Sequence, residues 1–131
     1  MGKLKVAILG VGSIGQYHAR EFDRLGANVV AILARTKKSA EEKTRTLKQL
    51  YGITANAYSD LNELLDNERL DIVSVCTSPK VHSKQVGQCL ENNTHVLCEK
   101  PLVFDSISNN YAVAKGLFKL ASDKDRTLSV N

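Results

Sequence analysis

The feature that most constrains this sequence is a glycine-rich stretch, Gly10 to Gly15, which directly follows an apolar run and directly precedes an amphipathic segment. Glycine can turn the chain sharply out of a strand, let a phosphate approach the backbone, and let the next helix pack against that strand. G-x-G-x-x-G is common by chance, but between a strand and a helix it is typical of a dinucleotide-binding turn. The alternative is a glycine-rich turn that binds no ligand.

The first-turn N–H groups of the helix after this turn would face the phosphates, and the helix dipole would favour their negative charge. The turn therefore supplies five candidate cofactor-binding residues: Gly10, Gly12, Ser13, Ile14 and Gly15.

Apolar runs and amphipathic segments alternate along the whole chain. The pattern predicts strands over residues 3–9, 28–33, 55–58, 71–76, 95–98 and 127–130. It predicts helices over residues 13–25, 38–51, 79–92 and 105–122, with a short one capped by Asp60 and another candidate cap at Asp105. Near-continuous apolar strands joined by helices are typical of a parallel sheet covered on both faces. We therefore expect an α/β fold, a doubly wound and mostly parallel sheet of the Rossmann type, in a single domain over residues 1–131.

The amino-acid composition argues against several classes of partner. The chain has 131 residues, of which 43% are hydrophobic and 24% charged, an ordinary profile for a soluble domain. No apolar run approaches the ~20 residues that span a bilayer, and the N-terminus lacks the features of a signal peptide, so we expect no membrane partner. A net charge of +4 is mildly basic and does not require nucleic acid as a partner, and the lack of Trp with only 5% aromatic residues argues against base stacking, so we expect no nucleic-acid partner.

Three cysteines, Cys76, Cys89 and Cys98, form no paired motif, and their spacing to the histidines does not suggest zinc. We therefore expect a cytoplasmic protein without a metal. Cys76 and Cys98 are expected to fill the sheet core as small hydrophobes.

The end of the second predicted strand distinguishes NAD from NADP. An acidic residue there would bind the adenosine ribose and repel a 2′-phosphate. This sequence instead has Ala34, Arg35, Thr36 and Lys37, and no acid before Glu41. Guanidinium, hydroxyl and ammonium groups can hold a phosphate dianion, so the pattern favours NADP over NAD. The alternative is a solvated basic helix start.

Three motifs carry a resemblance to a known family. They are Gly10 to Gly15 with His18-Ala19, then Thr77-Ser78-Pro79-Lys80-Val81-His82, then His95-Val96-Leu97-Cys98-Glu99-Lys100-Pro101-Leu102. In this order they resemble the Gfo/Idh/MocA family of NAD(P)-dependent oxidoreductases, which act on sugars, cyclitols and related compounds. The second motif departs from the family's usual Thr-Pro-Asn, since Ser78 precedes the proline and Lys80 replaces the asparagine.

The resemblance implies roles for particular residues. Lys100 matches the catalytic lysine that holds the substrate hydroxyl, and Glu99 matches a glutamate near the nicotinamide ribose. Pro101 is expected to follow a cis peptide. The remaining implied cofactor-binding residues belong to the end of the fourth strand and its loop: Cys76, Thr77, Ser78 and His82. The plainer alternatives are a surface position for His82 and a packing role for His18.

The resemblance covers only the first of the family's two domains, and the second supplies the substrate pocket. We therefore expect this chain to bind the dinucleotide without efficient turnover, with substrate specificity residing elsewhere. An apolar surface left by the second domain would favour self-association. The alternative function is a non-catalytic module that senses NADP.

Overall fold

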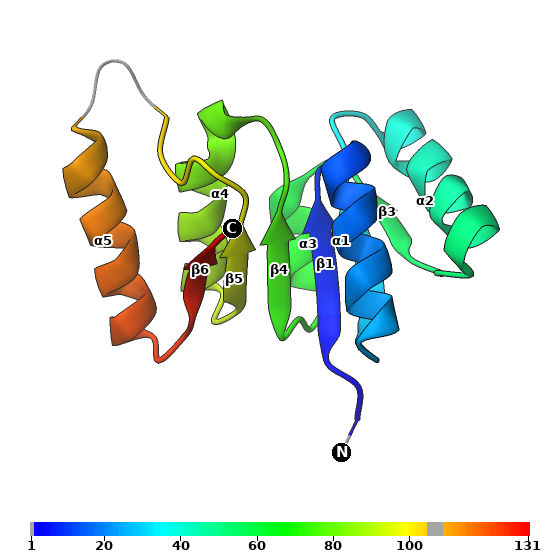
Figure 1. The fold of residues 1–131 in the computed structure, drawn as a ribbon, viewed down its shortest axis with the longest axis horizontal. Helices are drawn as coiled ribbons and strands as arrows, with labels where there is room; N and C mark the ends of the chain where they lie inside the picture. The colour runs from blue at the N-terminus through cyan, green and yellow to red at the C-terminus, as the bar shows by residue number, and fades with distance from the viewer. Residues whose placement is uncertain (1, 105–108) are drawn as a thin grey trace.

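The computed structural model describes residues 2–104 and 109–131 and shows one six-stranded sheet (Figure 1). The strands are β1 (Lys5–Leu9), β2 (Asn28–Leu33), β3 (Asn56–Tyr58), β4 (Ile72–Val75), β5 (His95–Cys98) and β6 (Leu128–Val130). All neighbours pair in parallel, in the order β3-β2-β1-β4-β5-β6. The order therefore reverses between β1 and β4, which is where open parallel sheets bind ligands at their carboxyl ends.

Five helices connect the strands within the described residues. They are α1 (Ser13–Arg24), α2 (Lys37–Tyr51), α3 (Leu61–Asn67), α4 (Pro79–Glu91) and α5 (Asn110–Asp123). Local signals explain where several begin and end. The side chain of Asp60 accepts a hydrogen bond from the Glu63 amide and caps α3, Pro79 occupies the first turn of α4, and Gly52 ends α2 with a φ of 71°.

The last helix begins later than the sequence pattern predicts. The expected range was 105–122, whereas α5 begins at Asn110 because the Asn109 side chain accepts a hydrogen bond from the Ala112 amide. The predicted cap Asp105 lies outside the described residues.

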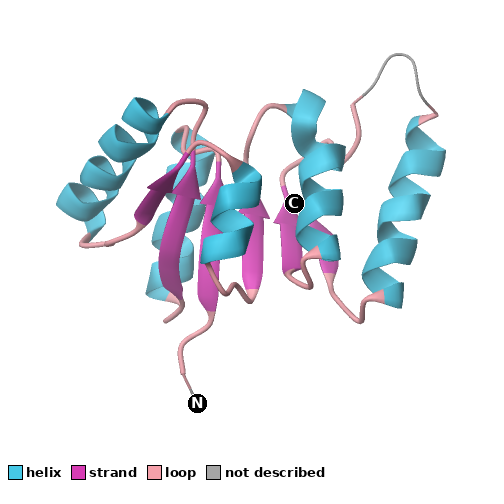
Figure 2. Cartoon of the chain, turned by 180° about the vertical axis from the view of Figure 1, so that it is seen from behind, coloured by secondary structure: helices cyan, strands magenta, loops and turns pink. Residues whose placement is uncertain are grey.

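Two apolar clusters lie on opposite faces of the sheet, so the predicted doubly wound Rossmann fold is confirmed (Figures 1 and 2). On one face, Ala19 of α1 and Leu47 of α2 pack with Ile8 of β1. On the other face, α3, α4 and α5 contribute buried side chains that include Leu64 and Leu90. Burial on both faces explains why the strands are almost continuously apolar.

The face that carries α1 is incomplete over the β5 and β6 edge. Its buried cluster has no member from β5 or β6 among the described residues. Tyr17, Phe22 and Leu25 of α1 border a shallow hollow there with Leu97 of β5. None of the described helices combines the length and apolarity needed to cross a membrane.

Candidate functional site

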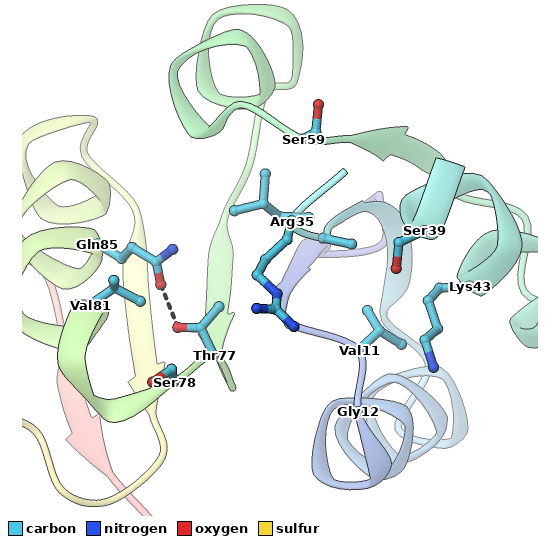
Figure 3. Close-up of a pocket in the computed structure, with 13 residues that line it drawn as sticks. Val11, Gly12, Arg35, Ser39, Lys43, Ser59, Thr77, Ser78, Val81 and Gln85 are labelled. Carbon is cyan, nitrogen blue, oxygen red and sulfur yellow. Dashed lines mark hydrogen bonds between the residues drawn. The ribbon is translucent and has the colours of Figure 1, made fainter. Parts of the chain in front are cut away.

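A cavity of about 720 Å³ opens at the carboxyl ends of β1, β2 and β4 (Figure 3). That size lies within the usual range for small-molecule and cofactor sites. The described residues that line it are Gly10, Val11, Gly12, Leu33, Ala34, Arg35, Ser39, Lys43, Ser59, Thr77, Ser78, Val81 and Gln85. None of these lining side chains is acidic, so the cavity suits an anionic ligand.

The three glycines of the turn after β1 have different structural roles. Gly10 has a φ of 83°, and a Cβ there would lie 2.7 Å from the Cys76 carbonyl oxygen. A Cβ on Gly15 would overlap the Gly10 carbonyl oxygen, so α1 approaches the turn as closely as backbone allows. At Gly12, by contrast, a Cβ would meet nothing within 4 Å. Gly10 and Gly15 therefore close the turn, and Gly12 leaves open space on the cavity side.

The N-terminus of α1 faces this open space. Gly12 is its N-cap residue, no side chain caps the helix, and the first turn contains no acidic residue. Ser13 and Ile14 follow and are exposed. The first-turn amides are therefore placed to bind an anion such as a pyrophosphate, which is the group that a dinucleotide would present here.

Two cations reach the cavity from the end of β2 and from α2. The Arg35 side chain extends into it between the Thr77 and Val11 sides, and Lys43 borders it from α2 (Figure 3). Neither side chain forms a hydrogen bond or ion pair with any part of the chain that the structure describes. Ser39 lies between them in sequence and also lines the cavity.

The other end of the site is formed by the segments after β4 and β5. Thr77 and Ser78 line the cavity after β4, with the Thr77 hydroxyl donating to Gln85 of α4. Glu99 and Lys100 follow β5, and Lys100 is exposed. The Lys100–Pro101 peptide bond is cis, as expected.

Comparisons with known proteins agree with this geometry. The profile described as an oxidoreductase family with an NAD-binding Rossmann fold, Gfo/Idh/MocA, matches residues 4–131. The chain belongs to the Gfo/Idh/MocA family. It is 34% identical over 99 residues to myo-inositol 2-dehydrogenase of Thermotoga maritima, covering 76% of this chain and 28% of that protein.

Solved structures match the whole fold. An NAD binding oxidoreductase from Klebsiella pneumoniae superposes with a TM-score of 0.85 at 22% identity, covering 99% of this chain and 34% of that chain. GenD2 from gentamicin A biosynthesis, in complex with NAD, gives a TM-score of 0.81 at 23% identity, covering 100% of this chain and 35% of that one. The chain spans about a third of the length of the relatives it matches, and the matched part is the family's NAD-binding Rossmann domain.

The structure brings many of the predicted site residues together. Six of them line the cavity: Gly10, Gly12, Ala34, Arg35, Thr77 and Ser78. Five others lie at the same edge of the sheet without lining the cavity, either in the first turn of α1 or directly after β5. These are Ser13, Ile14, Gly15, Glu99 and Lys100.

Two predicted phosphate ligands instead support the local structure. The Thr36 hydroxyl accepts a hydrogen bond from the Ser39 amide at 3.1 Å and caps α2. The Lys37 ammonium donates to the Ala57 carbonyl oxygen at 2.6 Å and lies 5.7 Å from the centre of the Tyr58 ring. Neither residue lines the cavity, because capping and the β3 edge already use their polar groups.

His82 also differs from the lining role that the resemblance implies. Its side chain is buried beneath the site, with Nε2 2.9 Å from the Thr77 carbonyl oxygen and Nδ1 2.8 Å from that of Pro101. His82 therefore holds the segment after β4 against the segment after β5. The surface position considered as the alternative is wrong, since only 1% of His82 is exposed.

Cys76 closes β4 behind the cavity. Burial raises the pKa of its thiol to about 11, and its Sγ lies 3.5 Å from Ser74 Oγ. At neutral pH the group is therefore a thiol rather than the reactive thiolate. The described residues contain no cluster of His, Cys, Asp or Glu that could hold a metal ion.

Sequence reasoning missed several residues of the site. Ser39 and Lys43 follow Arg35 at intervals of four, so helical spacing could have placed them on the face that borders β2. His18, expected to pack only, forms hydrogen bonds to Ser74 and Glu99. The others are Val11, Leu33, Ser59, Val81 and Gln85. Val11 and Val81 lie within the sequence motifs and Leu33 ends the predicted second strand, whereas only tertiary packing brings Ser59 and Gln85 to the cavity.

Proposed function

We propose that this chain binds NADP in the cavity and serves as the cofactor domain of an oxidoreductase that acts on a sugar, a cyclitol or a similar hydroxyl or carbonyl compound. The observation that carries the proposal is a pair of cations, Arg35 and Lys43, that have no polar partner among the described residues and lie beside an open glycine turn in a cavity whose described lining has no acidic side chain. An unpaired guanidinium and ammonium at this place favour a ligand with one more phosphate than NAD.

Different residues bind different parts of the dinucleotide. The α1 amides after Gly12 bind the pyrophosphate. Arg35, Lys43 and the Ser39 hydroxyl bind the adenosine 2′-phosphate at the end of β2. The other mononucleotide then lies over the ends of β4 and β5, since a dinucleotide spans the point where the strand order reverses.

Lys100 is the proposed catalytic residue. When bound, the nicotinamide supplies the hydride transfer. The exposed Lys100 ammonium follows β5 directly and donates a hydrogen bond to the substrate oxygen, which stabilises negative charge that develops there. The substrate class rests on relatives such as myo-inositol 2-dehydrogenase, in which this domain is about a third of the protein.

Titration calorimetry of the purified chain with NADPH and then NADH tests the cofactor. We expect NADPH to bind at least about tenfold more tightly, and Arg35→Ala to remove that difference, because a charge-assisted hydrogen bond contributes roughly 1.5–3 kcal/mol. Lys38→Ala is the matched control, since Lys38 neighbours the site but does not line it. Equal affinities would disprove the preference for NADP, and binding of neither would disprove the function.

Turnover requires a substrate held beside the cofactor, and we propose that this domain alone does not provide that pocket. We expect no measurable oxidation of myo-inositol or simple sugars by the chain, followed as NADPH absorbance. A specific rate that Lys100→Met abolishes would contradict this.

The hollow beside β5 is the proposed surface for self-association. Phe22, Leu25 and Leu97 present apolar side chains there. Sedimentation velocity should show reversible dimers that Leu25→Lys weakens. A monomer at all concentrations would contradict the proposal.

A further inference from the structure

A buried histidine joins the phosphate-binding helix to the ends of two strands. His18 lies on α1, one turn beyond Gly15, and is 7% exposed. Its Nδ1 lies 2.7 Å from Ser74 Oγ on β4. Its Nε2 lies 2.9 Å from Glu99 Oε1, directly after β5.

Serine, histidine and glutamate in this order have the composition of a hydrolytic triad. The burial of Ser74 excludes that role, because its side chain lies beneath α1 with no exposed surface. A substrate could not reach the hydroxyl. The three groups therefore bridge α1, β4 and β5.

The bridge leaves one oxygen of Glu99 available. A carboxylate only accepts hydrogen bonds, so the proton of the contact lies on His18 Nε2. Asn131 Nδ2 donates to the same Oε1 at 2.7 Å. Oε2 has no hydrogen bond from any residue in the described ranges 2–104 and 109–131. Since Glu99 is 18% exposed, Oε2 can accept a hydrogen bond from a bound ligand.

We propose that His18 is a positioning residue for the nicotinamide half of the dinucleotide. It holds Glu99 by Oε1, so that Oε2 faces the ribose hydroxyls over the end of β5, and it fixes that carboxylate relative to the α1 turn that binds the pyrophosphate. This inference rests on the proposed dinucleotide binding and concerns only the half of the ligand distant from Arg35.

The physical reason is the freedom of an unheld glutamate. A free Glu side chain populates several rotamers, and ordering it on ligand binding costs free energy. His18 removes that cost before the ligand arrives. The adenosine half gains nothing from this restraint, because its contacts come from the glycine turn, Arg35 and α2.

The test compares two ligands on four proteins. The ligands are the cofactor that the wild type binds more tightly, NADPH or NADH, and the matching fragment that lacks both the nicotinamide and its ribose, 2′-phospho-ADP or ADP. The proteins are the wild type, His18→Leu, His18→Gln and the control Gln16→Leu, which changes the same helix outside the bridge. Calorimetry measures each affinity.

We expect His18→Leu to weaken the complete cofactor about tenfold and the fragment by less than about twofold. His18→Gln should recover affinity to within about threefold of the wild type, since an amide can donate to Glu99 and accept from Ser74. The control should change neither affinity. If His18→Leu does not fold, Glu99→Gln in the wild type and in His18→Gln replaces it, and the two changes should not add.

Equal loss of both ligands in His18→Leu would overturn the proposal, because it would show a merely structural role. Unchanged affinity for the complete cofactor would overturn it as well. A wild type that binds the fragment as tightly as the cofactor would overturn the inference while sustaining the proposed function, and a wild type that binds neither would overturn both. Imidazole ¹⁵N spectra of the free chain should show a proton on His18 Nε2 whose resonance shifts in Glu99→Gln.

Discussion

The two sides of the proposed site, around the cavity and the strand ends beside it, are built in different ways. On the β1–β2 side, the surfaces offered to a ligand are backbone amides after Gly12 and two cations, Arg35 and Lys43, that bond to nothing else in the described chain. On the β4–β5 side, several polar side chains are already bonded across elements, as with His82 and the pair of His18 and Glu99. The polar groups of the β1–β2 side are therefore free to bind a ligand, whereas those of the β4–β5 side are already held in place by the protein.

This difference predicts how each half responds to substitution. Changes at groups without partners should lower affinity and leave stability almost unchanged, because nothing in the folded chain depends on them. Changes at bridged groups should lower stability first, since they leave buried polar atoms without partners.

Gly15→Ala against Gly12→Ala should give the largest contrast. At Gly15 a Cβ overlaps the Gly10 carbonyl, so we expect a loss of more than about 3 kcal/mol in the free energy of unfolding. At Gly12 the added methyl meets nothing and φ is −77°, so stability should change by less than about 1 kcal/mol while cofactor affinity falls at least tenfold, roughly the effect of one lost phosphate contact.

Urea unfolding and calorimetry on the two variants decide the point. Gly116→Ala is the control for the substitution itself, because this exposed helical glycine also has no neighbour and should become more stable by up to about 1 kcal/mol. Equal destabilisation at Gly12 and Gly15 would show that both glycines are needed for packing and that Gly12 leaves no open space for a ligand.

His82→Leu should give the next largest effect, and on stability. The substitution roughly keeps the volume but removes the two ring nitrogens that lie 2.9 Å and 2.8 Å from the Thr77 and Pro101 carbonyl oxygens, so those carbonyls lose this polar neighbour. We expect a loss of roughly 2–3 kcal/mol in the free energy of unfolding. Thermal unfolding measures it, with His95→Leu as the control at a less buried histidine. An unchanged melting temperature would mean that the segments after β4 and β5 hold each other without His82.

The same difference separates the features that could be predicted from the sequence from those that could not. The strand order, the glycine turn and Arg35 depend on local periodicity and local backbone chemistry, which the sequence carries directly. His82 and His18 depend on partners 19 and 81 residues away, and no local pattern indicates what they bond to. The sequence pattern predicts Lys37 and Thr36 as phosphate ligands, whereas the structure turns them to Ala57 and to the Ser39 amide, because adjacency in sequence does not determine which way a side chain at a helix start turns.

Lys43→Ala should weaken NADPH binding by about three- to fivefold at low salt and leave NADH binding unchanged. Lys43 forms no hydrogen bond or ion pair with the described residues, and a partly exposed charge pair is worth up to about 1 kcal/mol. The difference should shrink as the salt concentration rises, because exposed charges are screened. The same loss for NADH would place Lys43 on the pyrophosphate instead.

Lys37→Met should have the smallest effect and separates a cation that the fold uses from one that the ligand uses. The change keeps most of the stem but removes the hydrogen bond to the Ala57 carbonyl and the charge beside the Tyr58 ring. We expect a loss of at most about 1 kcal/mol in stability, since both contacts are exposed. The ratio of NADPH to NADH affinity should stay within about twofold of the wild type, measured beside Lys43→Ala. If Lys37→Met lowers that ratio instead, the Lys37 ammonium leaves the Ala57 carbonyl and binds the 2′-phosphate. The phosphate would then be bound by a cation that the free fold uses, in addition to Arg35 and Lys43.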